Sequence, residues 1–177
     1  MGLLVDSLLL ATVLAAAFFD LRERRVPNLL TFPAILLGLA LSASDGLTSF
    51  GWHAGATLLA LLIGFVFYAT GVMGGGDGKL LAAIAAFRGL DFLGASLLWA
   101  LVVGGVVSAL LLLRRRELLP FFRRFFDVFV GFALSRHLDA EELLSRRGHM
   151  IPLAVIIAIG VVTALAFEWY AGAAIPF

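Results

Sequence analysis

Two aspartates stand where apolar stretches of the sequence end. Asp20 follows two phenylalanines, and Asp77 lies between three glycines and a Gly-Lys pair. An ionisable group at the edge of an apolar segment is costly, so it calls for a functional or a pairing explanation. Two carboxylates that meet in such a place can share one proton, which is the arrangement aspartic proteases use to activate water. The two aspartates therefore predict acid–base chemistry on a water molecule.

Three consecutive glycines, Gly74, Gly75 and Gly76, precede Asp77. Helix propensity does not favour such a run, whereas glycine lets the backbone open and lets another chain approach closely. The cluster fits a site at which an extended substrate strand reaches the carboxylate. A turn between two spans, or close packing of small residues between helices, would explain the same glycines. A solvated charge at the end of a span would likewise explain Asp20 taken alone.

Other kinds of catalytic or cofactor site find no support in the sequence. A phosphate loop requires Gly and Ser or Thr at two positions where the chain has Met73 and Leu80, and Lys79 replaces the third glycine of a dinucleotide motif. The three histidines are scattered and form no metal-binding motif. Gly-x-Ser-x-Gly is absent, and a chain without Cys has no thiolate ligand or Cys nucleophile. We therefore expect neither a metal nor a cofactor.

The composition is that of an integral membrane protein. Hydrophobic residues make up 62% of the 177, against roughly 45–50% in an ordinary soluble domain, and the mean hydropathy is +1.07. The first apolar segment carries Asp6 and is not preceded by Lys or Arg. It is therefore predicted to be a membrane span rather than a cleaved signal peptide.

Six apolar stretches predict an all-α, polytopic fold with about six transmembrane helices. The fourth stretch is too short to cross a bilayer by itself, so it needs residues 77–78 at one end and 90–93 at the other, or a locally thinner bilayer. No repeat or linker divides the chain, and residues 1–177 are expected to form a single transmembrane domain. The predicted spans are residues 3–19, 29–44, 54–72, 80–88, 94–113 and 150–167.

The basic residues fix the predicted orientation. Alternation of the six spans places all thirteen Lys and Arg residues except Arg88 on one side, which the positive-inside rule makes the cytoplasmic side of the cytoplasmic (inner) membrane. Asp20 and Asp77 then both face the cytoplasm, while the two termini and the turn at residues 44–51 lie outside.

The longest connection is a cytoplasmic loop at about residues 114–149. Within residues 117–148, phenylalanines recur at helical spacing opposite arginines. This pattern predicts one amphipathic helix lying in the membrane interface. A helix that binds a partner or forms an oligomer is the alternative interpretation.

Both aspartate segments resemble motifs of the type IV prepilin peptidases, and the resemblance covers nearly the whole chain. Residues 20–28 read Asp-Leu-Arg-Glu-Arg-Arg-Val-Pro-Asn and are similar to the family's Asp-x5-Ile/Val-Pro-Asn stretch. Residues 74–80 read Gly-Gly-Gly-Asp-Gly-Lys-Leu and are similar to its Gly-x-Gly-Asp motif followed by Lys-Leu. Residues 151–153 are similar to the proline-containing start of its last helix.

The resemblance implies a membrane aspartic endopeptidase whose catalytic pair is Asp20 and Asp77. Family members cut the short basic leader of prepilins and pseudopilins at the cytoplasmic face, just before the apolar helix. The implied partners are such substrates and the lipid bilayer, not nucleic acid, and the oligomeric state is not predicted. The residues expected to bind substrate or shape the site are Gly74, Gly75, Gly76, Lys79, Pro27 and Asn28.

Three departures from the longer family members carry expectations of their own. The chain begins directly with the first span and has no Cys-x-x-Cys portion, so it resembles the short, peptidase-only members found with Flp (tight-adherence) pili and the archaeal preflagellin peptidases. We therefore expect no N-methylation of the product. Gly78 stands where an aliphatic residue is usual, and it is expected to loosen the start of the fourth span.

Two other classes of protein remain as alternatives. A proton- or cation-coupled transporter would use intramembrane carboxylates, but it predicts residues near the membrane midplane and usually repeated halves. A non-catalytic scaffold of a pilus assembly machine would also be a polytopic membrane protein. The two intact aspartate motifs favour the peptidase.

Overall fold

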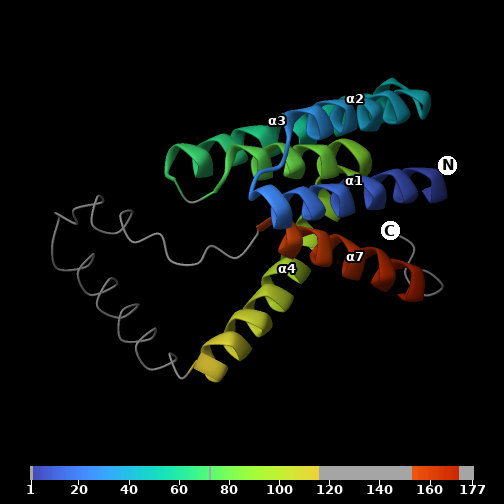
Figure 1. Cartoon of the computed structure of the whole chain (residues 1–177). Coiled ribbons are helices and arrows are strands. Elements are labelled where there is room, and N and C mark those ends of the chain that lie inside the picture. Colours follow the sequence, from blue (N-terminus) through green and yellow to red (C-terminus); the bar gives the residue numbers. More distant parts are fainter. Residues whose placement is uncertain (1, 72, 116–152, 172–177) are drawn as a thin grey trace, which may run out of the picture. The chain divides into compact units, whose positions relative to one another are not determined.

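A computed structural model of the chain describes residues 2–71, 73–115 and 153–171 (Figure 1). Every element in these ranges is a helix, which confirms the predicted all-α class. Four of the helices are long and apolar enough to cross a membrane, and α2 is a shorter apolar helix. The elements are α1 (Gly2–Glu23), α2 (Asn28–Ser44), α3 (Leu47–Ala69), α4 (Gly75–Arg115) and α7 (Leu153–Ala171).

The helix boundaries differ from the predicted spans in several places. Five labelled helices correspond to the six predicted spans, because α4 contains both the fourth and the fifth. Since α3 begins at Leu47, the predicted turn at residues 44–51 shrinks to a connection of Asp45 and Gly46. The amphipathic helix predicted at residues 117–148 lies outside the described residues.

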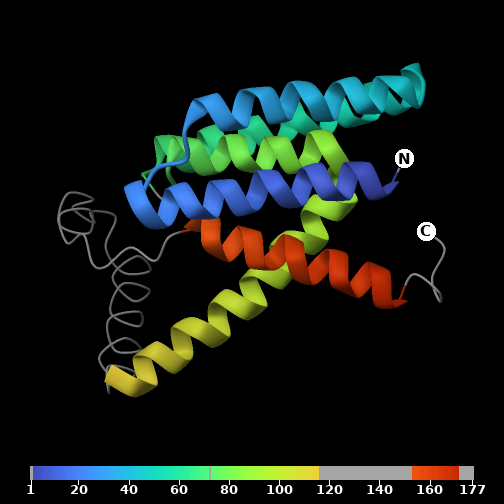
Figure 2. The ribbon, with the colours of Figure 1, turned by 45° about the vertical axis from the view of Figure 1, so that its right-hand side comes forward.

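A break at Gly89 divides α4 into two helical parts. Gly89 has φ 76° and ψ −174°, a conformation that is open essentially to glycine alone. Arg88 bonds Glu168 near the end of α7, whereas Ser96 lies beside Gly160, eight residues earlier in α7. The chain therefore turns back at Gly89 and leads along α7 from Glu168 toward Gly160, and Figure 2 shows this turn. The fourth predicted span is thus extended to Gly75 at its start but not through residues 90–93, which corrects the sequence prediction.

The first part of α4 lies at the centre of the helix bundle. All side chains of residues 80–87 are at most 6% exposed, whichever way they point. Around them α1 packs against α7 and α2, and α2 packs against α3. The helices approach closely, since a Cβ on Gly38 would lie 2.8 Å from the carbonyl carbon of Ala86, and small residues of this kind are what lets transmembrane helices associate. The central helix is therefore held from several sides, and Asp77 stands in its first turn.

An ionic cluster joins three helices at the other end of this central helix. Arg88 forms ion pairs with Asp6 of α1, at 3.6 Å between Nε and Oδ1, and with Glu168 of α7. The guanidinium also lies 4.9 Å from the centre of the Phe92 ring. The single basic residue that the sequence placed on the side away from the aspartates thus has two acidic partners.

The chain divides into two compact units. One comprises Met1–Leu101 and Ile151–Phe177, and the other comprises Val102–Met150. All contacts described above, and all the predicted site residues, belong to the first unit. The second unit contains the last part of α4, where exposed apolar side chains such as Val106 and Leu110 suit contact with lipid. A single domain over residues 1–177 stays a prediction.

Candidate active site

The structure brings the two predicted aspartates to the same end of the bundle. Asp20 lies near the C-terminal end of α1, and Asp77 lies in the first turn of α4. The connection between α1 and α2 packs closely against the start of α4. A Cβ on Gly76 would lie 2.8 Å from the carbonyl oxygen of Val26. In both Figure 1 and Figure 2 the end of α1 and the start of α4 lie at one end of the ribbon.

Asp20 is buried against the N-terminus of α7. The residue is only 7% exposed, and its Oδ2 atom accepts a hydrogen bond of 2.9 Å from the backbone N–H of Ala154. Ala154 is the second residue of α7, whose first-turn N–H groups have no partner within the helix. The positive end of the α7 dipole therefore faces a buried carboxylate, which offsets part of the cost of taking that group out of water.

Asp77 is half-buried and folds back over the residue before its helix. Its backbone N–H donates to the carbonyl oxygen of Gly74 at 3.1 Å, and its carboxylate accepts a backbone hydrogen bond from Gly74. The carboxylate thus supplies the half of a capping box in which the N3 side chain accepts the N-cap N–H, while Gly74 has no side chain to supply the other half. A Cβ on Gly74 would lie 3.0 Å from Oδ2 of Asp77, so glycine leaves room for the carboxylate in this position.

The two carboxylates lie within electrostatic range of each other. The charge of Asp20 acts on Asp77 across the site, although α1 and α4 are separated in sequence by two other helices. Each carboxylate also has a backbone N–H donor, from Ala154 and Gly74 respectively. The arrangement is a pair of interacting carboxylates held by main-chain groups, and such a pair can share a proton and exchange it with water.

The Pro-Asn pair and Lys79 link α2 to α4 beside the aspartates. Pro27 precedes α2 with φ −70° and ψ 140°, and its carbonyl accepts the backbone N–H of Leu30 at 3.1 Å. Lys79 donates from Nζ to Oδ1 of Asn28 at 2.6 Å, and the same ammonium lies 5.1 Å from the centre of the Phe32 ring. These predicted site residues are therefore brought together.

Gly78 packs tightly instead of loosening the helix start. It is buried, and a Cβ there would lie 3.0 Å from the Cα atom of Gly64 in α3. A Cβ on Gly64 would in turn lie 2.6 Å from the Cα atom of Gly78. The expectation drawn from the missing aliphatic residue is wrong, because the two helices cross at a spacing that only a pair of glycines allows.

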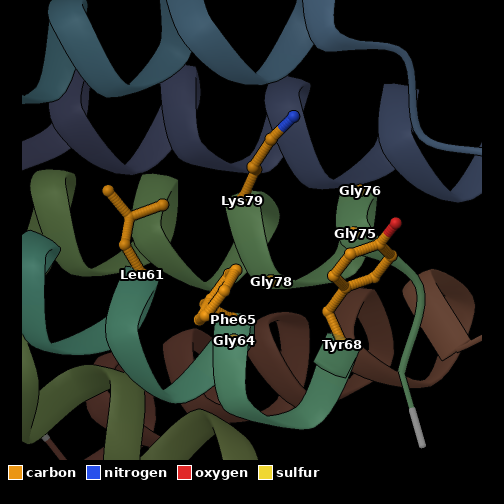
Figure 3. A pocket seen from close by; sticks show the side chains of 8 residues that line it. All are labelled: Leu61, Gly64, Phe65, Tyr68, Gly75, Gly76, Gly78 and Lys79. Carbon is orange, nitrogen blue, oxygen red and sulfur yellow. The ribbon is translucent and has the colours of Figure 1, made fainter. Parts of the chain in front are cut away.

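A groove of about 530 Å³ lies between α3 and the first turns of α4 (Figure 3). Its lining includes the glycines that precede and follow Asp77 in the sequence. Phe65 and Tyr68 stand on α3 and face the glycines of α4, whereas the Lys79 side chain extends toward α2. Apart from Lys79, the lining is apolar, aromatic or glycine. The lining residues are Leu61, Gly64, Phe65, Tyr68, Gly75, Gly76, Gly78 and Lys79.

Sequence reasoning missed several of these groups. Ala154 contributes only its backbone N–H, so its side chain gave no signal. Phe65 and Tyr68 lie in an apolar span, where they could not be told apart from residues that contact lipid. In the described ranges, no group of three or more His, Asp or Glu side chains gathers as metal ligands would.

The fold and the site define a class of protein: a polytopic helical membrane protein with two aspartates at one end of its helix bundle. A family model described as the type IV leader peptidase family matches residues 7–109, which is more than half of the chain and includes both aspartates. The chain belongs to this family. It is therefore a peptidase with a type IV leader peptidase role and prepilin-type substrates, as the sequence resemblance implied. Neither the curated proteins nor the solved structures gave a match.

Proposed function

We propose that the protein is an aspartic endopeptidase that cuts the short basic leader from prepilin-like substrates with Asp20 and Asp77. The observation that carries the proposal is the placement of a buried and a half-buried carboxylate at one end of the bundle, each accepting a hydrogen bond from a backbone N–H. Main-chain donors at the start of α7 and just before α4 hold both groups in place before substrate arrives, which is what preorganised acid–base catalysis requires.

The proposed mechanism divides the work between the two aspartates. One carboxylate, ionised, takes a proton from the attacking water, and the other, protonated, donates a hydrogen bond to the scissile carbonyl oxygen. The proton then passes to the leaving nitrogen as the peptide bond breaks. Coupled carboxylates titrate as a pair, so these roles are assigned to the pair and not to either residue.

The proposed site faces the cytoplasm from the cytoplasmic membrane. Arg22, Arg24 and Arg25 follow Asp20, and Lys79 follows Asp77, so basic residues gather at the aspartate end of the described bundle. Basic residues favour the cytoplasmic side in short loops. A short basic leader is then within reach of the aspartates while the apolar part of the substrate stays in the bilayer.

Co-expression with a candidate prepilin tests the proposal, with loss of the leader followed on a gel. Asp20→Asn and Asp77→Asn are each expected to abolish cleavage, because each carboxylate has a separate task. Asp91→Asn is the matched control, since Asp91 is exposed and lies near the Gly89 break instead of the aspartates. Near-normal cleavage by either Asn variant at Asp20 or Asp77 would refute the aspartic mechanism.

A further inference from the structure

We propose that the groove between α3 and α4 binds the apolar segment of the substrate that follows the cut, and not the basic leader. This inference rests on the proposed function and names the part of the substrate that the site holds. It also makes Phe65 and Tyr68 determinants of substrate recognition, a role that no sequence motif assigns to them.

The lining of the groove suits an apolar partner. Phe65 and Tyr68 are 65% and 57% exposed, so each presents a large ring surface that a partner would bury. Opposite them, Gly75 has only the Tyr68 ring near its missing Cβ, at 3.4 Å. Gly76 and Gly78 already pack against Val26 and Gly64, so Gly75 is the glycine of α4 whose backbone a second chain could approach closely. An apolar segment of another chain can therefore lie along the exposed faces of these rings and bury them.

The one charged group in the lining opposes the leader. Lys79 is held by the neutral Oδ1 atom of Asn28 and by the Phe32 ring. Among the residues that the structure describes, no salt bridge joins Lys79 to a carboxylate. A leader rich in Lys and Arg would be repelled by this ammonium, which has the same charge. Its charged groups would also lose hydration against the other, apolar walls of the groove.

The position of the groove also supports binding of the apolar segment inside it and of the leader outside it. Gly75, Gly76 and Gly78 line it and immediately flank Asp77 in the first turn of α4. Asp77 is not itself part of the lining, but a peptide along these glycines passes within one helical turn of it. With the apolar segment in the groove, the scissile bond lies beside Asp77 and the basic leader extends beyond it, away from Lys79.

Phe65 and Phe67 provide a matched pair for the test. Both are exposed phenylalanines of α3, at 65% and 44%, but only Phe65 lines the groove. We expect Phe65→Ala to raise the KM for the precursor by about tenfold, the scale of one aromatic anchor in an apolar contact, with a smaller change in kcat. Phe67→Ala is expected to leave both constants near those of the unchanged protein.

A photo-crosslinking amino acid at position 65 or 67 then identifies the bound segment. In an Asp77→Asn background, the residue at position 65 is expected to crosslink to the precursor within its apolar segment, and the residue at 67 is not. Crosslinks from 65 to the basic leader, equal crosslinking from both positions, or an unchanged KM for Phe65→Ala would overturn the inference. Absence of cleavage by the unchanged protein would instead refute the proposed function, so the two failures are distinguishable.

Discussion

Asp20 and Ala154, 134 positions apart in sequence, are joined by a hydrogen bond of 2.9 Å from the backbone N–H of Ala154 to the Asp20 carboxylate. The contact ties the end of α1 to the start of α7 in the middle of the candidate site. A residue with no reactive side chain thereby orients one of the two carboxylates.

Removing this donor is expected to slow cleavage. Ala154→Pro lacks the N–H group, and proline is tolerated in the first turn of a helix, whereas Ala154→Gly keeps the donor and serves as the control. A hydrogen bond to a charged group contributes about 1.5–3 kcal/mol, so a loss of about tenfold or more in the cleavage rate is expected. The rates are measured on a purified precursor, alongside thermal unfolding in detergent. If the Pro and Gly variants cleave equally fast at equal stability, the donor has no such role.

The glycine pair between α3 and α4 gives a prediction about stability. Gly64→Ala puts a Cβ 2.6 Å from the Cα atom of Gly78, and overpacking of this kind typically costs about 1–3 kcal/mol. Gly55→Ala, on the same helix but with open space around its missing Cβ, is expected to be neutral or slightly stabilising, by up to about 1 kcal/mol. Thermal unfolding in detergent compares the two. A Gly64 variant as stable as the Gly55 variant would contradict the close helix crossing.

The cluster around Arg88 predicts a graded loss of stability. Arg88→Met keeps an apolar chain but leaves Asp6, which is 9% exposed, without its ion pair, and an unsatisfied buried polar group costs about 1–3 kcal/mol. Glu168→Gln should cost less, because the Glu168 side chain is 44% exposed and Arg88 keeps Asp6. Unfolding temperatures measured under one detergent condition give the order, and the reverse order would show that Asp6 does not depend on Arg88.

The predicted orientation can be tested with single cysteines, since the chain has none of its own. Arg22→Cys and Asp45→Cys replace exposed residues at the end of α1 and between α2 and α3. A membrane-impermeant thiol reagent is expected to label position 45 from outside the cell and position 22 only after the cytoplasmic side is opened. The opposite pattern would invert the topology and move the aspartates to the outer face.

The placement of Asp20 and Asp77 at one end of the bundle was predictable, because a few charges in a very apolar chain must lie at the ends of spans and alternation of the spans puts these two at one end. The reversal near Arg88 was also indicated, since the short fourth stretch had to be followed by a return. The predicted spans also placed the turn between residues 88 and 94, and the structure puts it at Gly89. The helical path of residues 90–93 was not settled by the sequence, because these residues could equally have extended the fourth span.

The groove could not be predicted for a different physical reason. In a lipid solvent, a phenylalanine that contacts lipid and one that lines a binding surface look the same in sequence. Phe65 and Phe67 differ only in which way the α3 face is turned, and this follows from the crossing of Gly64 with Gly78. The role of Gly64 itself depends on a partner in the next helix, so the residue alone gives no signal.

The turn at Gly89 has a consequence for how the chain enters the membrane. Residues 75–88 span only about 20 Å at ~1.5 Å per residue, less than the ~30 Å hydrocarbon core, and they carry Asp77, Lys79 and Arg88. Such a segment partitions poorly into lipid by itself. It must therefore enter together with the apolar residues that follow Gly89, as a helical hairpin, and a nascent chain that stops at Arg88 would leave Asp77 short of its place in the bilayer.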